Sequence, residues 1–195
     1  MSALDAGFVL GAYLLGAIPF GLVLGKALGG VDVRAAGSGN IGATNVARTA
    51  GKKIGALVLL LDALKALIPV VLARELFPHD VALHAAVAAA AVLGHVFPIY
   101  LKFRGGKGVA SAMGALLALA PQATLGALVL FAIVFAVTRL VSLGSLLGAS
   151  LTVVLTFAMG YPRPYAFCAL GIALLIVVRH QGNIARMLQG SENKL

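Results

Sequence analysis

The feature that most constrains the fold of this chain is the separation of its charged residues from long apolar runs. The 195 residues include 15 lysines and arginines but only six aspartates and glutamates, and 61% of them are hydrophobic. A soluble domain of this length is usually about half apolar and about a quarter charged. Apolar runs of this length are stable in lipid as helices, so the composition predicts an all-α, polytopic integral membrane protein.

Seven hydrophobic segments can be distinguished, and nearly all of the charge lies between them. They comprise residues 4–26, 54–73, 80–98, 108–121, 123–139, 142–160 and 164–180. The fourth segment is short, and only Pro121 and Gln122 separate it from the fifth. We therefore expect seven transmembrane helices, with five or six as the alternative. No polar stretch exceeds about 30 residues, too few for a core of its own, so residues 1–195 are expected to form a single membrane domain.

The basic residues between these segments predict an orientation. With seven spans, one set of breaks holds Lys26, Arg34, Arg48, Lys52, Lys53, Lys102, Arg104, Lys107, Arg139, Arg179, Arg186 and Lys194, and the opposite set holds Arg74 and Arg163. Basic residues are retained on the cytoplasmic side, so we expect the N-terminus outside and the C-terminus in the cytoplasm. Asp62 and Lys65 lie three apart within the second segment, and we interpret them as a structural ion pair rather than substrate ligands.

The first cytoplasmic break, residues 37–48, has the composition of an anion-binding segment. Its glycines allow tight turns that bring backbone N–H groups close to an anion, and its hydroxyl and amide side chains add neutral donors. If a helix begins near Ile41, its N-terminus also favours negative charge. The candidate binding residues here are Ser38, Gly39, Asn40, Thr44, Asn45 and Arg48.

The second break, residues 94–108, contains Arg104-Gly-Gly-Lys107-Gly, which lacks the spacing of a Walker A motif. Lys107 would lie at the membrane edge, where its ammonium suits a phosphate. Lys102 is either a second ligand or a lipid-headgroup anchor, and His95 is favoured as a packing or capping residue over a catalyst. The candidate binding residues of this break are Lys102, Arg104, Gly106 and Lys107.

Two further breaks add polar groups on the same side. His180 and Asn183 are three apart, so they share a helix face at the end of the seventh segment. Ser142 and Ser145 follow Arg139 and can either bind a substrate or cap a helix. These four residues complete the predicted site.

The same composition argues against several classes of function. The four histidines have no metal-ligand spacing, paired carboxylates are missing, and Cys168 is the single cysteine, so we predict neither a metal nor a cofactor. The net charge of +9 is divided among short clusters at membrane edges. That pattern favours membrane lipid and anionic substrates as partners over nucleic acid.

Three stretches resemble the signature segments of a known family: GSGNIGATNVART from Gly37, GHVFPIYLKFRGGKGVAS from Gly94 and RHQGNIARML from Arg179. In this order and in a chain of this length they resemble the bacterial acyl-phosphate-dependent glycerol-3-phosphate acyltransferases, the PlsY family. Ala66 departs from the family's usual glycine after Lys65, which affects packing rather than chemistry. Gln181 and Gly182 replace a commonly charged pair, so no mechanism is based on a carboxylate there.

The resemblance implies a multi-pass enzyme of the bacterial inner membrane with a cytoplasmic site. It would transfer a fatty acyl group from acyl phosphate to the 1-hydroxyl of glycerol 3-phosphate, without a required protein partner, giving lysophosphatidic acid and phosphate. The resemblance assigns catalysis to Arg48, Lys107, His180 and Asn183. Either His180 or the donor phosphate would take the proton, and we favour the phosphate with His180 orienting. The alternative from another class is a transporter of a phosphorylated solute.

Overall fold

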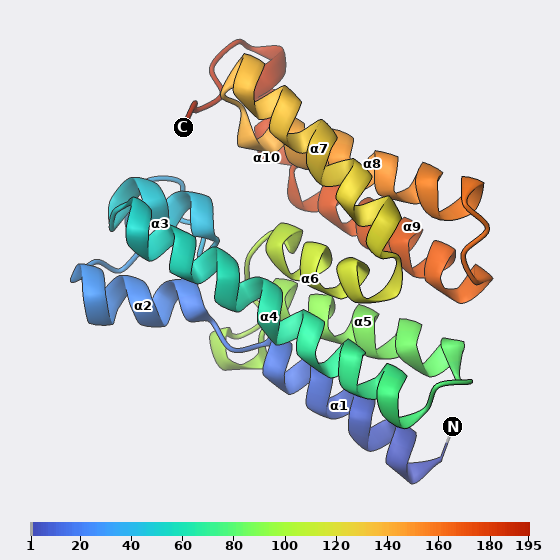
Figure 1. Ribbon diagram of the computed structural model, residues 1–195. Coiled ribbons are helices and arrows are strands. Elements are labelled where there is room, and N and C mark those ends of the chain that lie inside the picture. The colour runs from blue at the N-terminus through green and yellow to red at the C-terminus, as the bar shows by residue number, and fades with distance from the viewer. Residues whose placement is uncertain (1) are drawn as a thin grey trace.

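The computed structural model describes residues 2–195, and every regular element within them is helical (Figure 1). The longer helices are α1 (Ala3–Gly16), α2 (Phe20–Gly29), α4 (Lys52–Leu76), α5 (Val81–Val96), α6 (Val109–Leu119), α7 (Pro121–Thr138), α8 (Val141–Ala158) and α9 (Arg163–Arg179). Three short helices occupy the breaks: α3 (Ala43–Thr49), η1 (Ile99–Leu101) and α10 (Gln181–Leu188). The predicted all-α class is confirmed.

All seven predicted segments are helical, but they differ in length. Five helical stretches are long and apolar enough to cross a membrane, and a sixth is added if α9 and α10, which are bent by 58°, count as one span. Helix α6 has 11 residues, about 16 Å of helix, roughly half of the hydrocarbon thickness of a bilayer. The alternative of five or six spans therefore has direct support from helix length.

The first predicted segment is divided at Pro19 into α1 and α2, whereas Pro69 lies inside a continuous α4. At the break, the carbonyl of Ile18 accepts a hydrogen bond of 2.7 Å from Lys65 Nζ. The same Nζ lies 2.7 Å from Asp62 Oδ1, so the expected ion pair is confirmed. Both side chains are buried, and each charge compensates the other within the helix bundle.

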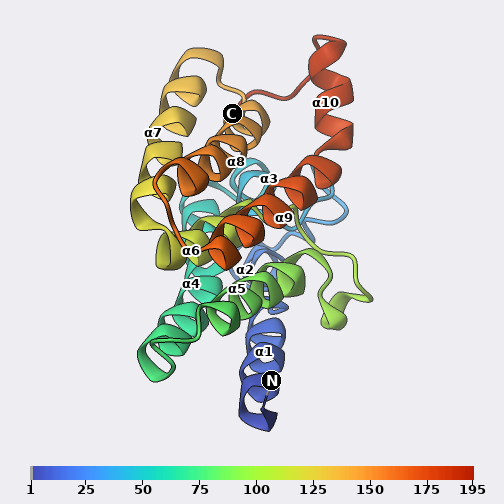
Figure 2. The same ribbon diagram turned by 90° about the vertical axis from the view of Figure 1, so that its right-hand side faces the viewer.

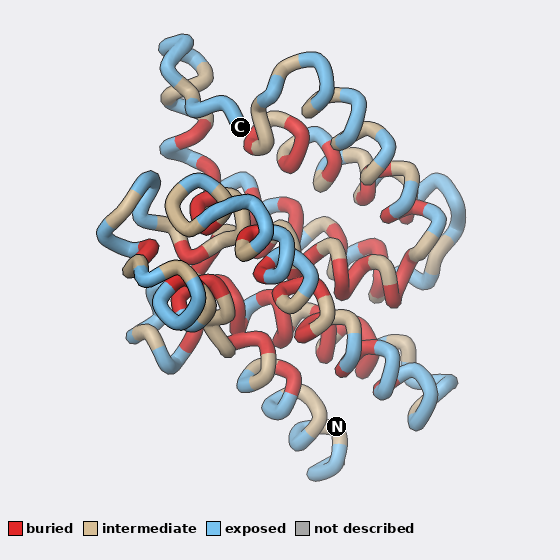
Figure 3. Tube along the Cα trace, turned by 60° about the vertical axis from the view of Figure 1, so that its left-hand side comes forward, coloured by how far each residue is buried: buried red, intermediate tan, exposed pale blue. Residues whose placement is uncertain are grey.

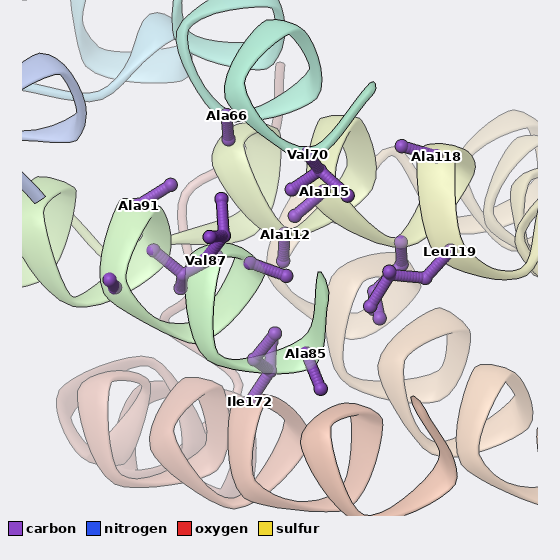
Figure 4. Packing of buried hydrophobic residues seen from close by; sticks show 14 of the residues in the cluster. Ala66, Val70, Ala85, Val87, Ala91, Ala112, Ala115, Ala118, Leu119 and Ile172 are labelled. Atoms are coloured by element: carbon purple, nitrogen blue, oxygen red, sulfur yellow. The ribbon is translucent and has the colours of Figure 1, made fainter. Parts of the chain in front are cut away.

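Small residues allow the central helices to approach closely. Helix α5 packs against α1, α4, α6 and α9. A Cβ on Gly16 would lie 2.1 Å from the carbonyl oxygen of Ala91, and one on Gly94 would lie 2.2 Å from that of Tyr13. Only glycine fits at these crossings, as is common between membrane helices. Figure 4 shows the alanines and valines that fill the remaining space between α4, α5, α6 and α9.

The outer surface of the bundle is apolar. Figure 3 shows buried residues gathered along the inner sides of the helices and exposed ones on the outside. Large exposed side chains include Val129, Val137, Leu174 and Phe167. In a membrane these side chains contact lipid tails, so their exposure is favourable there.

The polar breaks lie toward one end of the molecule. Figure 1 shows α3, α10 and the C-terminus at this end, while the N-terminus and the turn between α4 and α5 lie at the other. The view in Figure 2 gives the same separation of α10 from the N-terminus. The fold thus brings segments far apart in the sequence to the same end.

Candidate active site

A polar cavity of about 150 Å³ lies where four breaks of the chain meet. Its walls come from the 38–48 segment, from the residues before α6, from the start of α8 and from the region between α9 and the C-terminus. Ten predicted site residues line it: Ser38, Asn40, Thr44, Asn45, Arg48, Lys107, Ser142, Ser145, His180 and Asn183. The fold thus brings these ten residues to one cavity.

Four predicted residues do not line this cavity. Gly39 and Arg104 line a separate depression of about 600 Å³, together with Arg34 and Arg179. Lys102 is exposed, and its left-handed backbone (φ 51°) belongs to the tight turn that ends η1. The remaining residue is Gly106, which is buried beneath the cavity wall.

The amide of Asn45 organises the first segment. Its Oδ1 accepts from the Ser38 N–H at 2.8 Å, and its Nδ2 donates to the carbonyls of Val33, Ala36 and Asn40 at 2.8 to 3.1 Å. The positive φ angles of Gly37 and Gly39, 59° and 69°, allow the chain to wrap around this buried side chain. Because these bonds already use the Asn45 amide, its main effect is to shape the loop that exposes its neighbours.

Lys107 and Asn183 meet across the cavity. Lys107 Nζ donates a hydrogen bond to Asn183 Oδ1, and Asn183 Nδ2 donates to Glu192 Oε1 at 2.5 Å. Burial lowers the pKa of Lys107 to about 8, because the charged ammonium is poorly solvated there. The neighbouring cations Arg186 and Arg48 lower it further, whereas Glu192 opposes the shift. An anionic ligand would be attracted to this ammonium.

Glu192 lines the cavity although it is not among the predicted site residues. Its carboxylate accepts hydrogen bonds from Ser142 Oγ at 2.9 Å and from Arg186 Nε at 2.7 Å, besides that from Asn183. Burial opposes its charge, but these bonds outweigh burial and hold the pKa of Glu192 below its ordinary value. The predicted site residues include no carboxylate, so Glu192 adds a negative charge to the expected set of cations and neutral donors. The left-handed Gly190 (φ 68°), which reverses the chain after α10, was the available signal.

The C-terminal tail also contacts the first segment. An Arg48 Nη donates to the carbonyl of Asn193 at 3.0 Å, and the Leu195 N–H donates to the carbonyl of Arg139 at 3.1 Å. Through these contacts Glu192 and Asn193 form part of the cavity wall.

A hydrogen bond from one ring nitrogen fixes the imidazole of His180 and leaves the other nitrogen available to a ligand. His180 is 3% exposed, and its Nδ1 lies 2.8 Å from the carbonyl oxygen of Ile176. Since a carbonyl can only accept, Nδ1 carries the proton, and Nε2 of the neutral ring is left as an acceptor. This is the tautomer that a base or an orienting residue requires. Ser145 Oγ, by contrast, donates to the carbonyl of Val141 within its own helix.

An apolar groove of about 210 Å³ adjoins the polar cavity. The two share Leu59, Val109, Ala110, Phe131 and Ser145. From these residues the groove extends between α6, α7, α8 and α9, and its deeper lining includes Leu116, Thr152 and Ile172. One end of the combined space is therefore cationic and hydrogen-bonding, and the other is lined almost wholly by hydrocarbon.

A helical membrane protein whose polar cavity opens into an apolar groove is suited to an enzyme that joins a polar molecule to a lipid chain. The family model of glycerol-3-phosphate acyltransferases matches residues 6–190. The chain is 52% identical to a glycerol-3-phosphate acyltransferase of Anaeromyxobacter dehalogenans (strain 2CP-C), over 98% of each chain. It is 50% identical to one of Myxococcus xanthus (strain DK1622), over 98% of this chain and 100% of the relative.

Solved structures agree with these relatives. The crystal structure of PlsY, an integral membrane glycerol 3-phosphate acyltransferase, in its glycerol 3-phosphate form, matches with a TM-score of 0.95 and 42% identity, over 99% of this chain and 96% of that one. Its lysophosphatidic acid form matches with a TM-score of 0.92 at 41% identity, with the same coverage. The chain belongs to the glycerol-3-phosphate acyltransferase family, and it is an integral membrane acyltransferase.

Proposed function

We propose that this protein transfers a fatty acyl group from acyl phosphate to the 1-hydroxyl of glycerol 3-phosphate, giving lysophosphatidic acid and inorganic phosphate. The observation that carries the proposal is the direct junction of the cationic cavity with the apolar groove. Both substrates are anionic, and only the donor carries a long hydrocarbon chain. The relatives solved in glycerol 3-phosphate and lysophosphatidic acid forms support the acceptor and the product.

The proposed arrangement puts the donor's chain in the groove and its phosphate in the cavity. The acyl carbon would then lie near the shared residues Phe131 and Ser145, at the boundary between the two spaces. Two phosphates repel each other, so cations are needed to hold them together, and Arg48 and Lys107 are the candidates. Within the 38–42 loop the N–H groups of Ser38, Gly39 and Gly42 are already bonded inside the segment, so those of Asn40 and Ile41 would add the neutral donors.

The chemical step is an addition followed by an elimination. The 1-hydroxyl oxygen attacks the acyl carbon, the resulting oxyanion is stabilised by nearby donors, and the bond from carbon to the phosphate oxygen breaks. Phosphate leaves with the bonding electrons, and the hydroxyl proton passes to a phosphate oxygen of the donor. His180 Nε2 is the free acceptor of the neutral ring and would orient glycerol 3-phosphate by accepting a hydrogen bond from its 2-hydroxyl, which leaves the 1-hydroxyl proton directed at the phosphate. Neither a covalent acyl-enzyme nor a metal is required.

We further propose a bacterial inner-membrane location, with residues 1–195 as a single domain, the N-terminus outside and the cavity on the cytoplasmic side. The supporting observation is that the breaks with most of the basic residues meet at one end of the fold. Alternating orientation then requires that the short α6 be counted as the fourth of seven membrane helices. No partner protein is needed for this arrangement.

The decisive experiment measures phosphate release by the detergent-purified protein. Palmitoyl phosphate and glycerol 3-phosphate are supplied together and singly, with palmitoyl-CoA as the control donor. The expected result is release that needs both substrates, formation of lysophosphatidic acid, and no product from the CoA ester. Acylation of glycerol 3-phosphate by palmitoyl-CoA but not by palmitoyl phosphate would overturn the proposed donor.

Substitutions test the residue assignments within the same assay. Arg48→Ala, Lys107→Ala and Asn183→Ala should each abolish turnover while far-ultraviolet circular dichroism stays that of the native fold. A near-native rate in any of them removes that residue from the site. His180→Ala should cripple turnover, since acid–base groups contribute about 100- to 10,000-fold, and a loss in kcat below about tenfold would argue against His180 as the main base.

A further inference from the structure

Two buried polar side chains on the long helices α4 and α5 also line the cavity. Asp62 on α4 and His95 at the end of α5 are 1% and 4% exposed. His95 Nδ1 lies 3.6 Å from Asp62 Oδ1, which is also the oxygen nearest to Lys65 Nζ. Among residues 2–195, neither His95 Nδ1 nor Asp62 Oδ1 has a hydrogen-bond partner, and their separation of 3.6 Å is longer than a hydrogen bond, so the carboxylate acts on the ring through its charge. Both side chains line the cavity floor.

The imidazole of His95 lies directly beneath the glycine loop that precedes α6. A Cβ added to Gly106 would lie 2.1 Å from His95 Nε2, so the ring edge occupies the space that any other side chain would need. Backbone hydrogen bonds also join the loop to the end of α5. The Gly106 N–H donates to the His95 carbonyl at 3.1 Å, and the Gly105 N–H donates to the Val96 carbonyl at 3.2 Å. The loop therefore rests on the end of α5 and on this ring.

The guanidinium of Arg179 donates hydrogen bonds to the carbonyls of the same loop. Arg179 donates from Nε to the Gly106 carbonyl at 3.3 Å and from an Nη to the Gly105 carbonyl at 3.2 Å. The two glycines are thus held between Arg179 and His95. Lys107 is the next residue, and its ammonium reaches into the cavity to Asn183. A shift of the Gly106 peptide would move the Lys107 Cα and change where its ammonium points.

We propose that Asp62 and His95 form a positioning pair for Lys107, in which the Asp62 carboxylate orients the His95 ring and the ring holds Gly106 in place. The pair does not contact the reacting atoms. It sets the location of the ammonium that receives an anionic substrate, and this rests on the role given to Lys107 in the proposed function. The buried ion pair of Asp62 with Lys65 extends this support to the Ile18 carbonyl.

His84 provides a matched control. It lies on the same helix as His95 and is 2% exposed, but it bonds to Tyr165 Oη at 2.6 Å and to the Phe77 carbonyl at 2.8 Å, and it does not line the cavity. His84→Ala and His95→Ala remove the same atoms from the same buried helix. A merely structural effect would be common to both variants, whereas an effect on the ligand would belong to His95→Ala alone.

The test is calorimetric binding of glycerol 3-phosphate to the full chain in detergent. His95→Ala and Asp62→Asn should weaken binding by about 10- to 100-fold, which is the worth of one hydrogen bond between a charged group and the ligand. His84→Ala should keep wild-type affinity even if its melting temperature falls as far as that of His95→Ala. Equal affinities for His84→Ala and His95→Ala would overturn the proposal, and if His95→Ala fails to fold, Asp62→Asn is judged by the same criterion.

A double-mutant cycle separates positioning from packing. In the Lys107→Ala background, His95→Ala should weaken binding no further, because the group on which it acts is gone. If His95→Ala weakens binding by the same factor in the wild-type and Lys107→Ala backgrounds, the proposal is overturned. If Lys107→Ala itself binds glycerol 3-phosphate normally, the proposed role of Lys107 fails. If Lys107→Ala binds weakly and His95→Ala normally, the site stands and only the positioning pair fails.

Discussion

Asn45→Ala is the substitution whose effect can best be worked out from the structure. The Asn45 amide makes four hydrogen bonds that tie the Ser38 N–H and the carbonyls of Val33, Ala36 and Asn40 together. Each such bond contributes about 1 kcal/mol net, and water can replace some of them at this end of the molecule, so the ordered loop should lose about 2–4 kcal/mol. None of the four partners has to contact the substrate for this loss to matter.

We expect Asn45→Ala to lower activity much more than it lowers the stability of the whole fold. If the ordered loop is needed for binding and catalysis, 2–4 kcal/mol corresponds to a fall in kcat/KM of about 30- to 1000-fold. The loop packs at the margin of the bundle, so the α5 core should stay folded. The assay is kcat/KM with both substrates in detergent, together with thermal unfolding followed by far-ultraviolet circular dichroism.

Thr49→Val is the control for this prediction. Thr49 Oγ1 donates one bond of 2.9 Å to the Asn45 carbonyl in the same short helix, so its loss costs no more than about 1 kcal/mol. Activity of Asn45→Ala within about threefold of Thr49→Val would refute the reasoning, because it would show that the loop stays ordered without the amide.

Three further predictions concern charge, groove and metal. Burial lowers the pKa of Lys107 to about 8, so its positive charge is lost as the pH rises through that value. We therefore expect kcat/KM to fall on an alkaline limb near pH 8. Lys107→Arg should lack this limb if the variant is active. Ala173 lines the apolar groove, so Ala173→Phe should reduce kcat/KM for palmitoyl phosphate more than for a donor with a shorter chain; an equal reduction would place the chain elsewhere. Among residues 2–195 no group of three His, Cys, Asp or Glu side chains can hold a metal ion, so EDTA should leave the rate unchanged, and inhibition that added Mg²⁺ reverses would contradict this.

The helices and the polar breaks follow from local features of the sequence. The alternation of apolar runs with Gly- and Lys/Arg-rich breaks predicted seven helical segments, because hydropathy and chain-breaking residues act over a few neighbours, but it did not divide the first of them into α1 and α2. The number of spans was less certain for the same reason. Composition marks 108–121 as apolar, but the 11-residue length of α6 depends on the loop before it and the turn at Ala120.

The membership of the site was predictable only in part. Arg48, Lys107, His180 and Asn183 were found because cations, amides and glycines cluster around each of them in the sequence, and all four line the cavity. Asn45 was found for a different reason from the one that the structure gives, since its amide is used within its own loop.

By itself, the sequence determined an all-helical membrane protein with anion-binding segments confined to its polar breaks. Only the tertiary structure decided which side chains from those breaks share one cavity. The chain reverses at Gly190, which places Glu192 in the cavity beside Asn183. A tight turn at Lys102 places that residue outside the cavity. The physical reason is that burial and charge preferences act locally, whereas a shared cavity requires contacts between residues far apart in the chain, which packing alone fixes.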